Sequence, residues 1–413
     1  MAVFPVRNSV NRFVKQFVFP FSAAGKCMIE GPVWTGVPQT PEARKQTPAC
    51  RPLGSRLNLI SQRSFPMPIV HDLIADQFGS HVGKYQGRLK VTKQKEVLAQ
   101  APLLHLESVT ISNSGVSISA DAIRACTEAG IPIHFLSSSG TPYASLYSAG
   151  LMGTVLTRRA QLDAYRDLRG VRLALGFAGG KIENQSRLIK YVAKYRKEAD
   201  PPLHQELRWL AGEVIDHMEE LGALDFIAPR EGYSIDDLRG QLLSIEGRAA
   251  QKYWQAFRVL LPEVLGWPGR QGRGARDPFN SALNYGYGVL YSQVERALVL
   301  AGLDPYGGFI HVDRPGKPSL VLDLIEEFRA PVVDRTILGL VNKGVALGQD
   351  ERGYLTEPTR RLLAERVLER LETAERYEQQ RHPLRAIIQM QARRVAAFVR
   401  SDRDAYDPFL AAW

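Results

Sequence analysis

Two patterns of apolar and polar residues follow one another along this chain of 413 residues. Between Phe78 and Leu146, short apolar runs alternate with glycines and polar turns, a pattern that predicts strands. Beyond Gly153, apolar residues recur every three or four positions, which predicts helices. We therefore expect an α+β protein in which a small β-rich N-terminal domain, residues 67–152, precedes a larger all-α domain, residues 153–413.

The β-rich part is expected to contain one helix among several strands. Asp121–Ala129 has a helical pattern, and Gly130 would end that helix. His134 lies in an apolar run, so we expect it to be packed and not reactive. The clearest strands are expected at Leu103–Ile111, Val116–Ile118, Ile131–Leu136 and Tyr143–Leu146.

A long helix is expected from Ser234 to Leu261. Ser234 and Asp237 have the spacing of a capping box, which marks a helix start. Glu246 lies beside the apolar stripe of this helix, where a carboxylate loses part of its water. That loss costs free energy unless the carboxylate pairs with a cation such as Arg248 or binds a metal ion. The stripe has a period of 3.6 residues and consists of Leu238, Leu242, Ile245, Ala249 and Tyr253.

The stretch from Asp277 to Arg335 has the densest set of unusual polar residues in the chain. Asn280 and Asn284 are four positions apart, so one helix face would carry both amides. His311 follows a Gly-Gly pair, and a basic loop, Arg314–Pro318, comes next.

A short helix is expected after that loop. Ser319 has the character of an N-cap, Leu320–Phe328 has a helical pattern, and Pro331 would end the helix. Spacings of three and four residues put two carboxylates on one helix face. The carboxylates in question are Asp323, Glu326 and Glu327.

His311 and two of these carboxylates would together suit a hard divalent cation. The competing interpretation is a solvated helix face and a packed histidine. Helical geometry alone does not choose between Glu326 and Glu327 as the second carboxylate.

Several separated motifs occur in one order: NSALNYGYGVL from Asn280, then GGFIH, SLVLDLIEEFR and VVDR. In these motifs the chain resembles the CRISPR-associated integrase family, the adaptation nuclease Cas one, from about residue 67 to about residue 397. The resemblance implies that His311, Glu326 and the Glu246 of an earlier Ile-Glu-Gly motif bind Mg²⁺ or Mn²⁺. It also implies a catalytic role for Asp323, either as a further ligand or by orienting the histidine.

The same resemblance implies a function. Members insert foreign DNA fragments as new spacers into a CRISPR array, by attack of a DNA 3′-hydroxyl on a phosphodiester, and they also cut DNA. They form homodimers through the β-rich domain and assemble with a small partner, Cas two. Two other classes are weighed against this function: a non-catalytic DNA-binding scaffold of the adaptation complex, and an unrelated metal hydrolase that acts on small molecules.

The net charge of +10 suggests a polyanionic partner, but its distribution weakens that inference. Residues 1–66 contribute +7 of it and read as a disordered or mis-annotated extension. Cys27, Cys50 and Cys126 have no metal-binding spacing and fit a reducing compartment. No run of about 18 apolar residues is present. We therefore expect a cytoplasmic protein without a transmembrane helix.

Three further segments could contact a phosphate backbone or form ordinary charged surface. Arg158–Arg208 holds twelve basic residues against six acidic ones, with tyrosines between them. Pro262–Pro278 is a loop rich in Gly, Pro and Arg, and Thr359–Arg400 is a charged helical region interrupted near Pro383. A fourth group has the spacing of a metal site, but we expect it to be an exposed helix face: Glu213, Asp216, His217 and Glu220.

Overall fold

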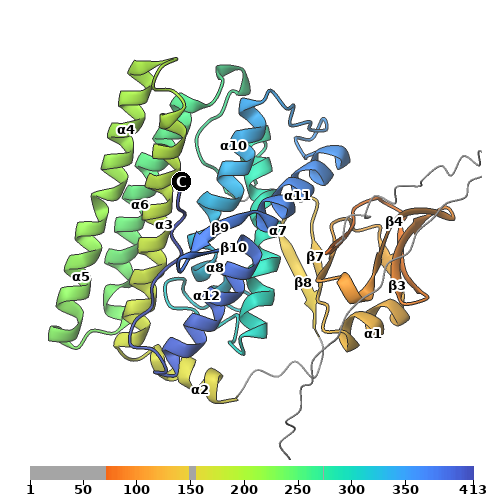
Figure 1. Cartoon of the computed structure of the whole chain (residues 1–413), viewed down its shortest axis with the longest axis horizontal. Coiled ribbons are helices and arrows are strands. Elements are labelled where there is room, and N and C mark those ends of the chain that lie inside the picture. The colour runs from red at the N-terminus through yellow and green to blue at the C-terminus, as the bar shows by residue number, and fades with distance from the viewer. Residues whose placement is uncertain (1–70, 148–154, 273) are drawn as a thin grey trace, which may run out of the picture. The chain divides into compact units, whose positions relative to one another are not determined.

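The computed structural model describes residues 71–147 and 155–413, with the exception of Arg273 (Figure 1). One sheet has the strand order β4-β3-β2-β6. In it, β2 (His81–Tyr85), β3 (Arg88–Lys93) and β4 (Glu96–Pro102) are antiparallel, and β6 (Ser117–Ile118) pairs parallel to β2. The tight turn between β2 and β3 includes Gly87 at φ 73°, a conformation that favours glycine.

A second sheet has the order β1-β5-β7-β8. Its strands β1 (Asp72–Ala75), β5 (Ser108–Ile111) and β7 (Ile133–Leu136) are parallel, and β8 (Pro142–Leu146) is antiparallel to β7. The helix α1 (Ala120–Glu128) precedes β7 and packs against β2. The two sheets and α1 share one apolar core, which includes Leu73, Val82, Leu89, Val109, Cys126 and Ile133.

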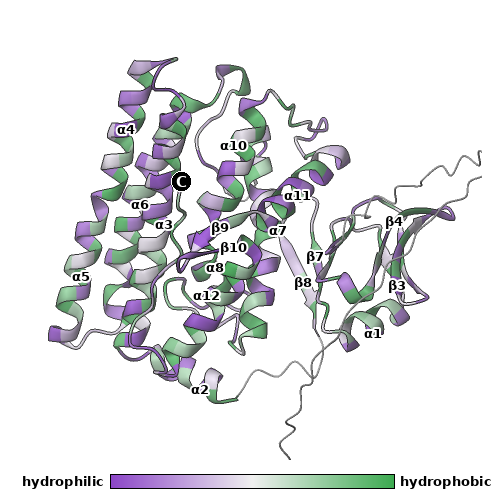
Figure 2. Cartoon of the chain, viewed as in Figure 1, coloured by the Kyte–Doolittle hydropathy of each residue, from purple (hydrophilic) through white to green (hydrophobic). Residues whose placement is uncertain are grey.

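The rest of the described chain is mostly helical. Its long central helix, α3, packs against α4, α5 and α6, and also against α9. In Figure 2, hydrophobic and hydrophilic residues alternate around α4 and α5, as expected for helices with one solvated face. The helices are α2 (Val155–Ala164), α3 (Leu168–Lys194), α4 (Pro201–Ile215), α5 (His217–Glu231), α6 (Ile235–Leu260), α7 (Pro278–Leu300), α8 (Ser319–Leu324), α9 (Glu326–Phe328), α10 (Arg335–Asn342), α11 (Glu357–Glu372) and α12 (Leu384–Val399).

The α+β prediction is confirmed, with one element that the pattern did not predict. The charged region Thr359–Arg400 is interrupted by a β-hairpin, β9 (Ala374–Tyr377) and β10 (Gln380–Pro383), and not simply by a break at the proline. The hairpin turn places Glu378 and Gln379 at φ 46° and 67°. Neither residue is glycine, so the usual turn signal was missing from the sequence.

Two predictions for the short helix are wrong. Ser319 is the first residue of α8 and not its N-cap, and its hydroxyl donates to the carbonyl of Val312, at 3.4 Å. Pro331 does not end the helical path, because it lies inside a π-helical segment, Arg329–Asp334, that continues into α10. The wider π turn accommodates a residue that has no N–H to donate.

The capping box at Ser234 is confirmed, with the backbone N–H of Ser234 donating to Asp237 at 2.8 Å. His134 is buried at 1% exposure, and burial, followed by the charge of Arg296, lowers its pKa to about 3, as expected for a packed neutral histidine. Cys126 is free and buried. Three predictions lie outside the described residues: those for the other two cysteines, for the extension 1–66 and for the domain boundary at residue 152. No helix within the described residues is long and apolar enough to cross a membrane.

Candidate active site

Four segments that are far apart in the sequence converge around one lysine. Lys181 lies on α3, Glu246 on α6 and Glu326 on α9. His311 lies in the loop that precedes α8. Because α3 packs against both α6 and α9, Glu246 reaches Lys181 from α6 and Glu326 reaches it from α9.

The two glutamates are held by ion pairs with Lys181. The lysine Nζ lies 2.9 Å from Oε2 of Glu326 and also contacts Oε1 of Glu246. Both glutamates are buried: Glu246 is 8% exposed and Glu326 is 4% exposed. Among the described residues, the buried Oε2 atom of Glu246 has no hydrogen-bond donor. Glu246 therefore has a cationic partner, as its position beside the apolar stripe required, and that partner is not Arg248, which pairs with Glu220.

Glu326 is ionised although it is buried. Burial raises the pKa of its carboxyl group, but Arg329, Lys181 and His311 together outweigh burial and lower that pKa to about 2. The Nε atom of Arg329 lies 3.2 Å from Oε1 of Glu326. Burial lowers the pKa of Lys181, but Glu326 and Glu246 outweigh it, so the net shift is upward and the lysine carries a charge.

Asp323 holds the loop that carries His311. Its buried carboxylate accepts from the backbone N–H groups of Phe309 at 2.5 Å, Ile310 at 3.1 Å and His311 at 3.1 Å. The same carboxylate pairs with Nδ1 of His311 at 2.7 Å. With both oxygens engaged in this way, Asp323 is a positioning residue: it fixes the imidazole ring and leaves Nε2 for another partner.

Gly308 explains why the loop can approach Asp323 so closely. A Cβ atom at this position would lie 2.6 Å from the Ser319 Cβ and 2.9 Å from the Asp323 carboxylate, closer than side chains tolerate. The second glycine of the GGFIH motif thus allows the backbone N–H groups that follow it to reach the carboxylate.

Glu327, the residue next to Glu326, has a different environment. Its carboxylate accepts from the backbone N–H of Phe409 at 2.9 Å, from the Gln391 amide at 2.8 Å and from the Tyr406 hydroxyl. Burial raises its pKa to about 7, although these hydrogen bonds oppose the shift. Glu327 therefore anchors the C-terminal segment against α9 and does not face the two paired glutamates.

The structure thus brings Glu246 and Glu326 together around Lys181, with His311 close enough to act electrostatically on Glu326. Within the described part of the chain, however, no group of three or more His, Cys, Asp or Glu side chains is arranged closely enough to hold a metal ion. The Lys181 ammonium group lies between the two carboxylates instead.

The α4–α5 cluster, which spans the end of α4 and the start of α5, is only partly the exposed helix face that we expected: Asp216 and Glu220 are exposed, whereas Glu213 and His217 are half-buried. Glu213 pairs with Lys252 at 2.8 Å, and Glu220 pairs with Arg248. The His217 ring bonds to the Glu213 carbonyl at 2.9 Å, one turn earlier. Glu213 and Glu220 therefore have cationic partners of their own.

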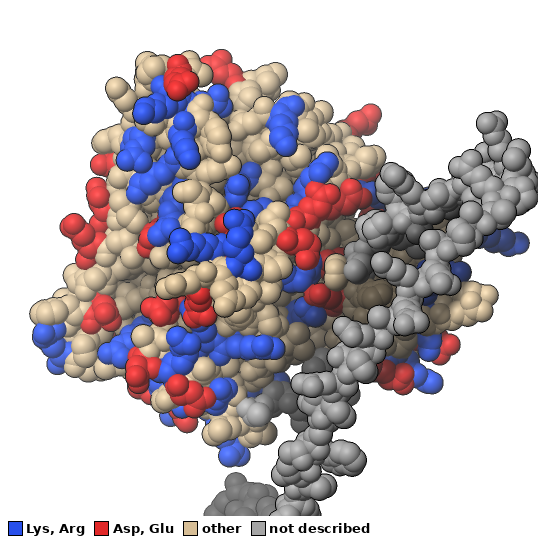
Figure 3. Space-filling model, viewed as in Figure 1, with Lys and Arg blue, Asp and Glu red and all other residues tan. Residues whose placement is uncertain are grey.

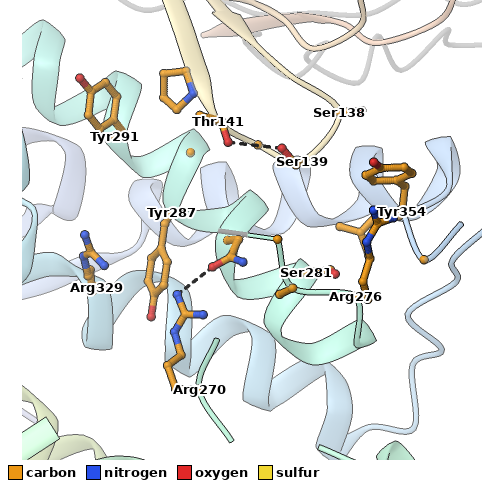
Figure 4. Close-up of a pocket in the computed structure, with 18 of the residues that line it drawn as sticks. Ser138, Ser139, Thr141, Arg270, Arg276, Ser281, Tyr287, Tyr291, Arg329 and Tyr354 are labelled. Carbon is orange, nitrogen blue, oxygen red and sulfur yellow. Dashed lines mark hydrogen bonds between the residues drawn. The ribbon is translucent and has the colours of Figure 1, made fainter. Parts of the chain in front are cut away.

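The basic loop before α7 packs against the two predicted amides. Arg270 donates to Asn284 at 2.7 Å and to Asn280 at 3.1 Å, so both amides do share one helix face. Arg270 also borders a cavity of about 550 Å³ that Arg276 and Arg329 line as well (Figure 4). Because Arg329 contacts Glu326 as well as this cavity, the candidate active site and the cavity adjoin.

The predicted phosphate-binding helices present a mixed surface. Figure 3 shows basic side chains in separate patches on one face, with acidic side chains between them. Tyr165 bonds to Asp236 at 2.8 Å, and Tyr191 packs against Tyr195 and Trp413, so part of the aromatic set serves the fold. In the C-terminal region, Arg400 pairs with Asp402 at 2.7 Å, which matches ordinary surface charge.

Sequence reasoning missed Lys181 and Arg329, the two cations that neutralise the site. Lys181 was counted only as one of twelve basic residues in Arg158–Arg208. A signal was present: the turn of α3 that carries it is otherwise rich in buried residues, including Ile182, Asn184 and Gln185. A lysine in such surroundings needs an anionic partner.

These features define a two-region α+β protein in which buried carboxylates pair with cations near the loop that carries His311. A family model described as CRISPR associated protein Cas1 matches residues 73–369. The chain belongs to this family.

Curated relatives agree with that assignment, and solved structures share the fold. The chain is 36% identical over 352 residues to CRISPR-associated endonuclease Cas1 1 of Archaeoglobus fulgidus, which covers 83% of this chain and 99% of the relative. It is 37% identical over 278 residues to Cas1 1 of Pyrobaculum aerophilum, covering 65% of this chain and 82% of that one. A CAS1 protein from Thermotoga maritima has the same fold, with a TM-score of 0.65 at 17% identity, over 82% of this chain and 99% of that chain. A casposase bound to an integration product is also similar in fold, with a TM-score of 0.68 at 20% identity, over 82% of this chain and 93% of that chain.

Proposed function

We propose that this chain is a metal-dependent DNA endonuclease and integrase that inserts foreign DNA fragments as new spacers into a CRISPR array. The observation that carries the proposal is the convergence of Glu246 and Glu326 beside His311, three residues that the family resemblance had assigned together. The curated relatives, which are named CRISPR-associated endonucleases, support the proposed reaction class.

The proposed metal ligands are Glu246, His311 and Glu326, for Mg²⁺ or Mn²⁺. Two features support this set: the buried Oε2 atom of Glu246 has no hydrogen-bond donor among the described residues, and Asp323 leaves Nε2 of the histidine available. Carboxylate oxygens suit both ions. A bound ion would polarise the phosphodiester and stabilise negative charge on it.

The chain's own residues would act on the same phosphodiester. Asp323 keeps the His311 ring in one orientation, so the histidine does not have to be ordered when DNA arrives. Arg329, beside Glu326, supplies a fixed guanidinium that can stabilise charge on a phosphate oxygen.

The nucleophile decides the outcome at this site. When a DNA 3′-hydroxyl oxygen forms the new bond to phosphorus, the old ester oxygen leaves and two DNA strands are joined. When water forms that bond, the strand is cut. One arrangement of residues therefore serves both integration and cleavage.

Three partners belong to the proposal: DNA, a second copy of this chain, and the small adaptation protein Cas2. One chain of a Cas6-RT-Cas1–Cas2 complex is similar in fold, with a TM-score of 0.63 at 21% identity, over 83% of this chain and 36% of that chain. The basic residues that line the cavity beside the site, Arg270, Arg276 and Arg329, would contact the DNA backbone without reading its sequence.

A strand-transfer assay tests the proposal. A labelled short duplex and a supercoiled plasmid would be incubated with the full-length protein and Cas2, in Mg²⁺ or Mn²⁺. We expect metal-dependent joining that His311→Ala and Glu246→Ala both abolish while DNA binding is retained. Glu213→Ala is the matched control, because Glu213 also pairs with a lysine but lies in the α4–α5 cluster.

Other outcomes of the assay would favour other functions. If the wild-type protein binds DNA but neither joins nor cuts it in any metal, the non-catalytic scaffold is supported. If it does not bind DNA at all, the small-molecule hydrolase gains support. Joining that survives both substitutions would show that the site lies elsewhere.

A further inference from the structure

Lys181 occupies a position that a simple DNA contact does not explain. Its side chain is only 16% exposed, and its Nζ atom lies between two buried carboxylates from different helices. Neither Glu246 nor Glu326 reaches the other directly, and the lysine joins them. Two buried carboxylates at such close quarters repel each other unless a cation lies between them.

The negative charge of the two glutamates is already balanced by cations of the protein. Lys181 and Arg329 together already balance the two glutamates, Lys181 through both carboxylates and Arg329 through Oε1 of Glu326. A divalent ion that bound both carboxylates would meet the lysine charge within a few ångströms. Like charges that close repel each other strongly in a partly buried site.

We propose that Lys181 is an internal counter-cation that holds Glu246 and Glu326 together in the metal-free protein and competes with the divalent ion for them. This inference rests on the proposed function, because it concerns the proposed metal ligands. The ammonium group leaves the two carboxylates when the ion binds them. Lysine suits this exchange because its charge is carried on a flexible four-carbon stem that can move away while the helix stays in place.

The opposite role for Lys181 makes the opposite prediction. If the lysine stayed in place and preorganised the carboxylates for the ion, its removal would weaken metal binding. If it competes, its removal strengthens metal binding. The direction of one change in affinity therefore separates the two roles.

Mn²⁺ affinity, measured by calorimetry on the full-length protein without DNA, tests the proposal. We expect Lys181→Met to bind Mn²⁺ at least about tenfold more tightly than the wild type, since a like charge is removed from the site. Lys181→Arg, which keeps the charge, should bind no more tightly than the wild type. Lys252→Met is the matched control, because it also breaks a lysine–glutamate pair but lies outside the site, and it should not change the affinity. Affinity that is unchanged or weaker in Lys181→Met would overturn the proposal.

Two measurements keep the proposal testable if Lys181→Met folds poorly. In thermal unfolding, Lys181→Met without metal should melt below the wild type, and Mn²⁺ should raise its melting temperature by more than it raises that of the wild type. In the wild type, reductive methylation read by mass spectrometry should modify Lys181 more in Mn²⁺ than without it. The extent of methylation of Lys252 should be the same in both conditions. Protection of Lys181 by Mn²⁺, or no change, would contradict the exchange.

These experiments distinguish failure of the inference from failure of the proposed function. If the wild type binds Mn²⁺ and Lys181→Met binds it no better, only the role of Lys181 is wrong. If neither protein binds Mn²⁺, the proposed metal ligands are wrong, and the inference is overturned with them.

Discussion

Glu326 and Glu327 are neighbours in sequence and both are buried, yet they have opposite surroundings. Glu326 lies among Arg329, Lys181 and His311, and its pKa is lowered to about 2. Glu327 is surrounded by neutral donors, and burial raises its pKa to about 7. Successive residues of a helix point about 100° apart, so one turn presents two carboxylates to two different parts of the protein.

The difference separates a chemical role from a structural one. A buried carboxylate that keeps its charge and already pairs with cations, as Glu326 does with Lys181 and Arg329, can bind a cation. A carboxylate with three hydrogen-bond donors and a raised pKa holds chain segments together. Neither spacing nor residue type distinguishes these roles, and only the surrounding charges do.

The largest expected effect comes from neutralising each glutamate in turn. Glu326→Gln should lower the rate of strand joining by at least about a hundredfold, because a proposed metal ligand is lost. Glu327→Gln keeps the shape of the side chain, its amide oxygen can still accept from Phe409 and Gln391, and it should leave joining within a few-fold of the wild type. The rates would be measured with the labelled duplex and plasmid at saturating Mn²⁺. Equal loss in both variants would mean that the contrast between the two residues has no functional meaning.

A smaller effect is expected for Asp323→Asn, which weakens the support of His311 without removing a proposed ligand. We predict a loss of joining of about 10- to 100-fold, typical of a residue that orients a ligand. Asp76→Asn is the control, because Asp76 is a buried carboxylate paired with Arg361 away from the site. A rate for Asp323→Asn equal to that of the control would show that the hydrogen bonds to the histidine loop are not needed.

On the other side of α9, stability should change and activity should not. Tyr406→Phe removes a hydroxyl that donates to Glu327 and should lower the free energy of unfolding by about 1–3 kcal/mol. Denaturant titration of the variant and the wild type measures the difference. If strand joining falls more than stability does, the C-terminal segment takes part in the reaction and is not only an anchor.

The smallest effect is a pH dependence of stability with opposite signs for the two glutamates. The folded pKa of Glu327 is raised above its unfolded value. Its contribution to the free energy of unfolding is therefore fully present below about pH 4.5 and is lost as the pH rises toward about 7. The folded pKa of Glu326 is lowered. Its contribution to the free energy of unfolding is therefore fully present above about pH 4.5 and is lost as the pH falls toward about 2.

Unfolding of Glu327→Gln at several pH values checks this assignment. Between about pH 5 and pH 7 the wild type should lose stability relative to the variant by on the order of 1 kcal/mol per pH unit. A difference between the two proteins that does not vary with pH would show that Glu327 titrates normally.

Local patterns predicted the fold class and the helix around Glu246 well. The capping box at Ser234 and the apolar stripe of α6 depend only on neighbouring residues, which the sequence displays directly. Pro331 and the hairpin β9–β10 were missed because a π-helical turn and a turn without glycine have no such local signal. In both places tertiary packing overrides residue preference.

The site was predictable only in part. The motif resemblance selected Glu246, His311, Asp323 and Glu326. The structure joins Glu246 to Glu326 through Lys181 and pairs His311 with Asp323, and the assignment of the four as catalytic and metal-binding residues stays a prediction. Lys181 was not predictable as a partner, because its anionic neighbours lie 65 and 145 positions further along the chain. Long-range ion pairs of this kind follow from helix packing and not from spacing.

The central claim is that Glu246, Glu326 and His311 form one metal site that excludes Glu327. Anomalous diffraction from crystals soaked in Mn²⁺ tests it most directly. We predict a peak at about 2 Å from a carboxylate oxygen of each of the first two glutamates and from Nε2 of the histidine, with Lys181 moved away. A peak elsewhere, or crystals that bind no Mn²⁺ at these residues, would contradict the claim.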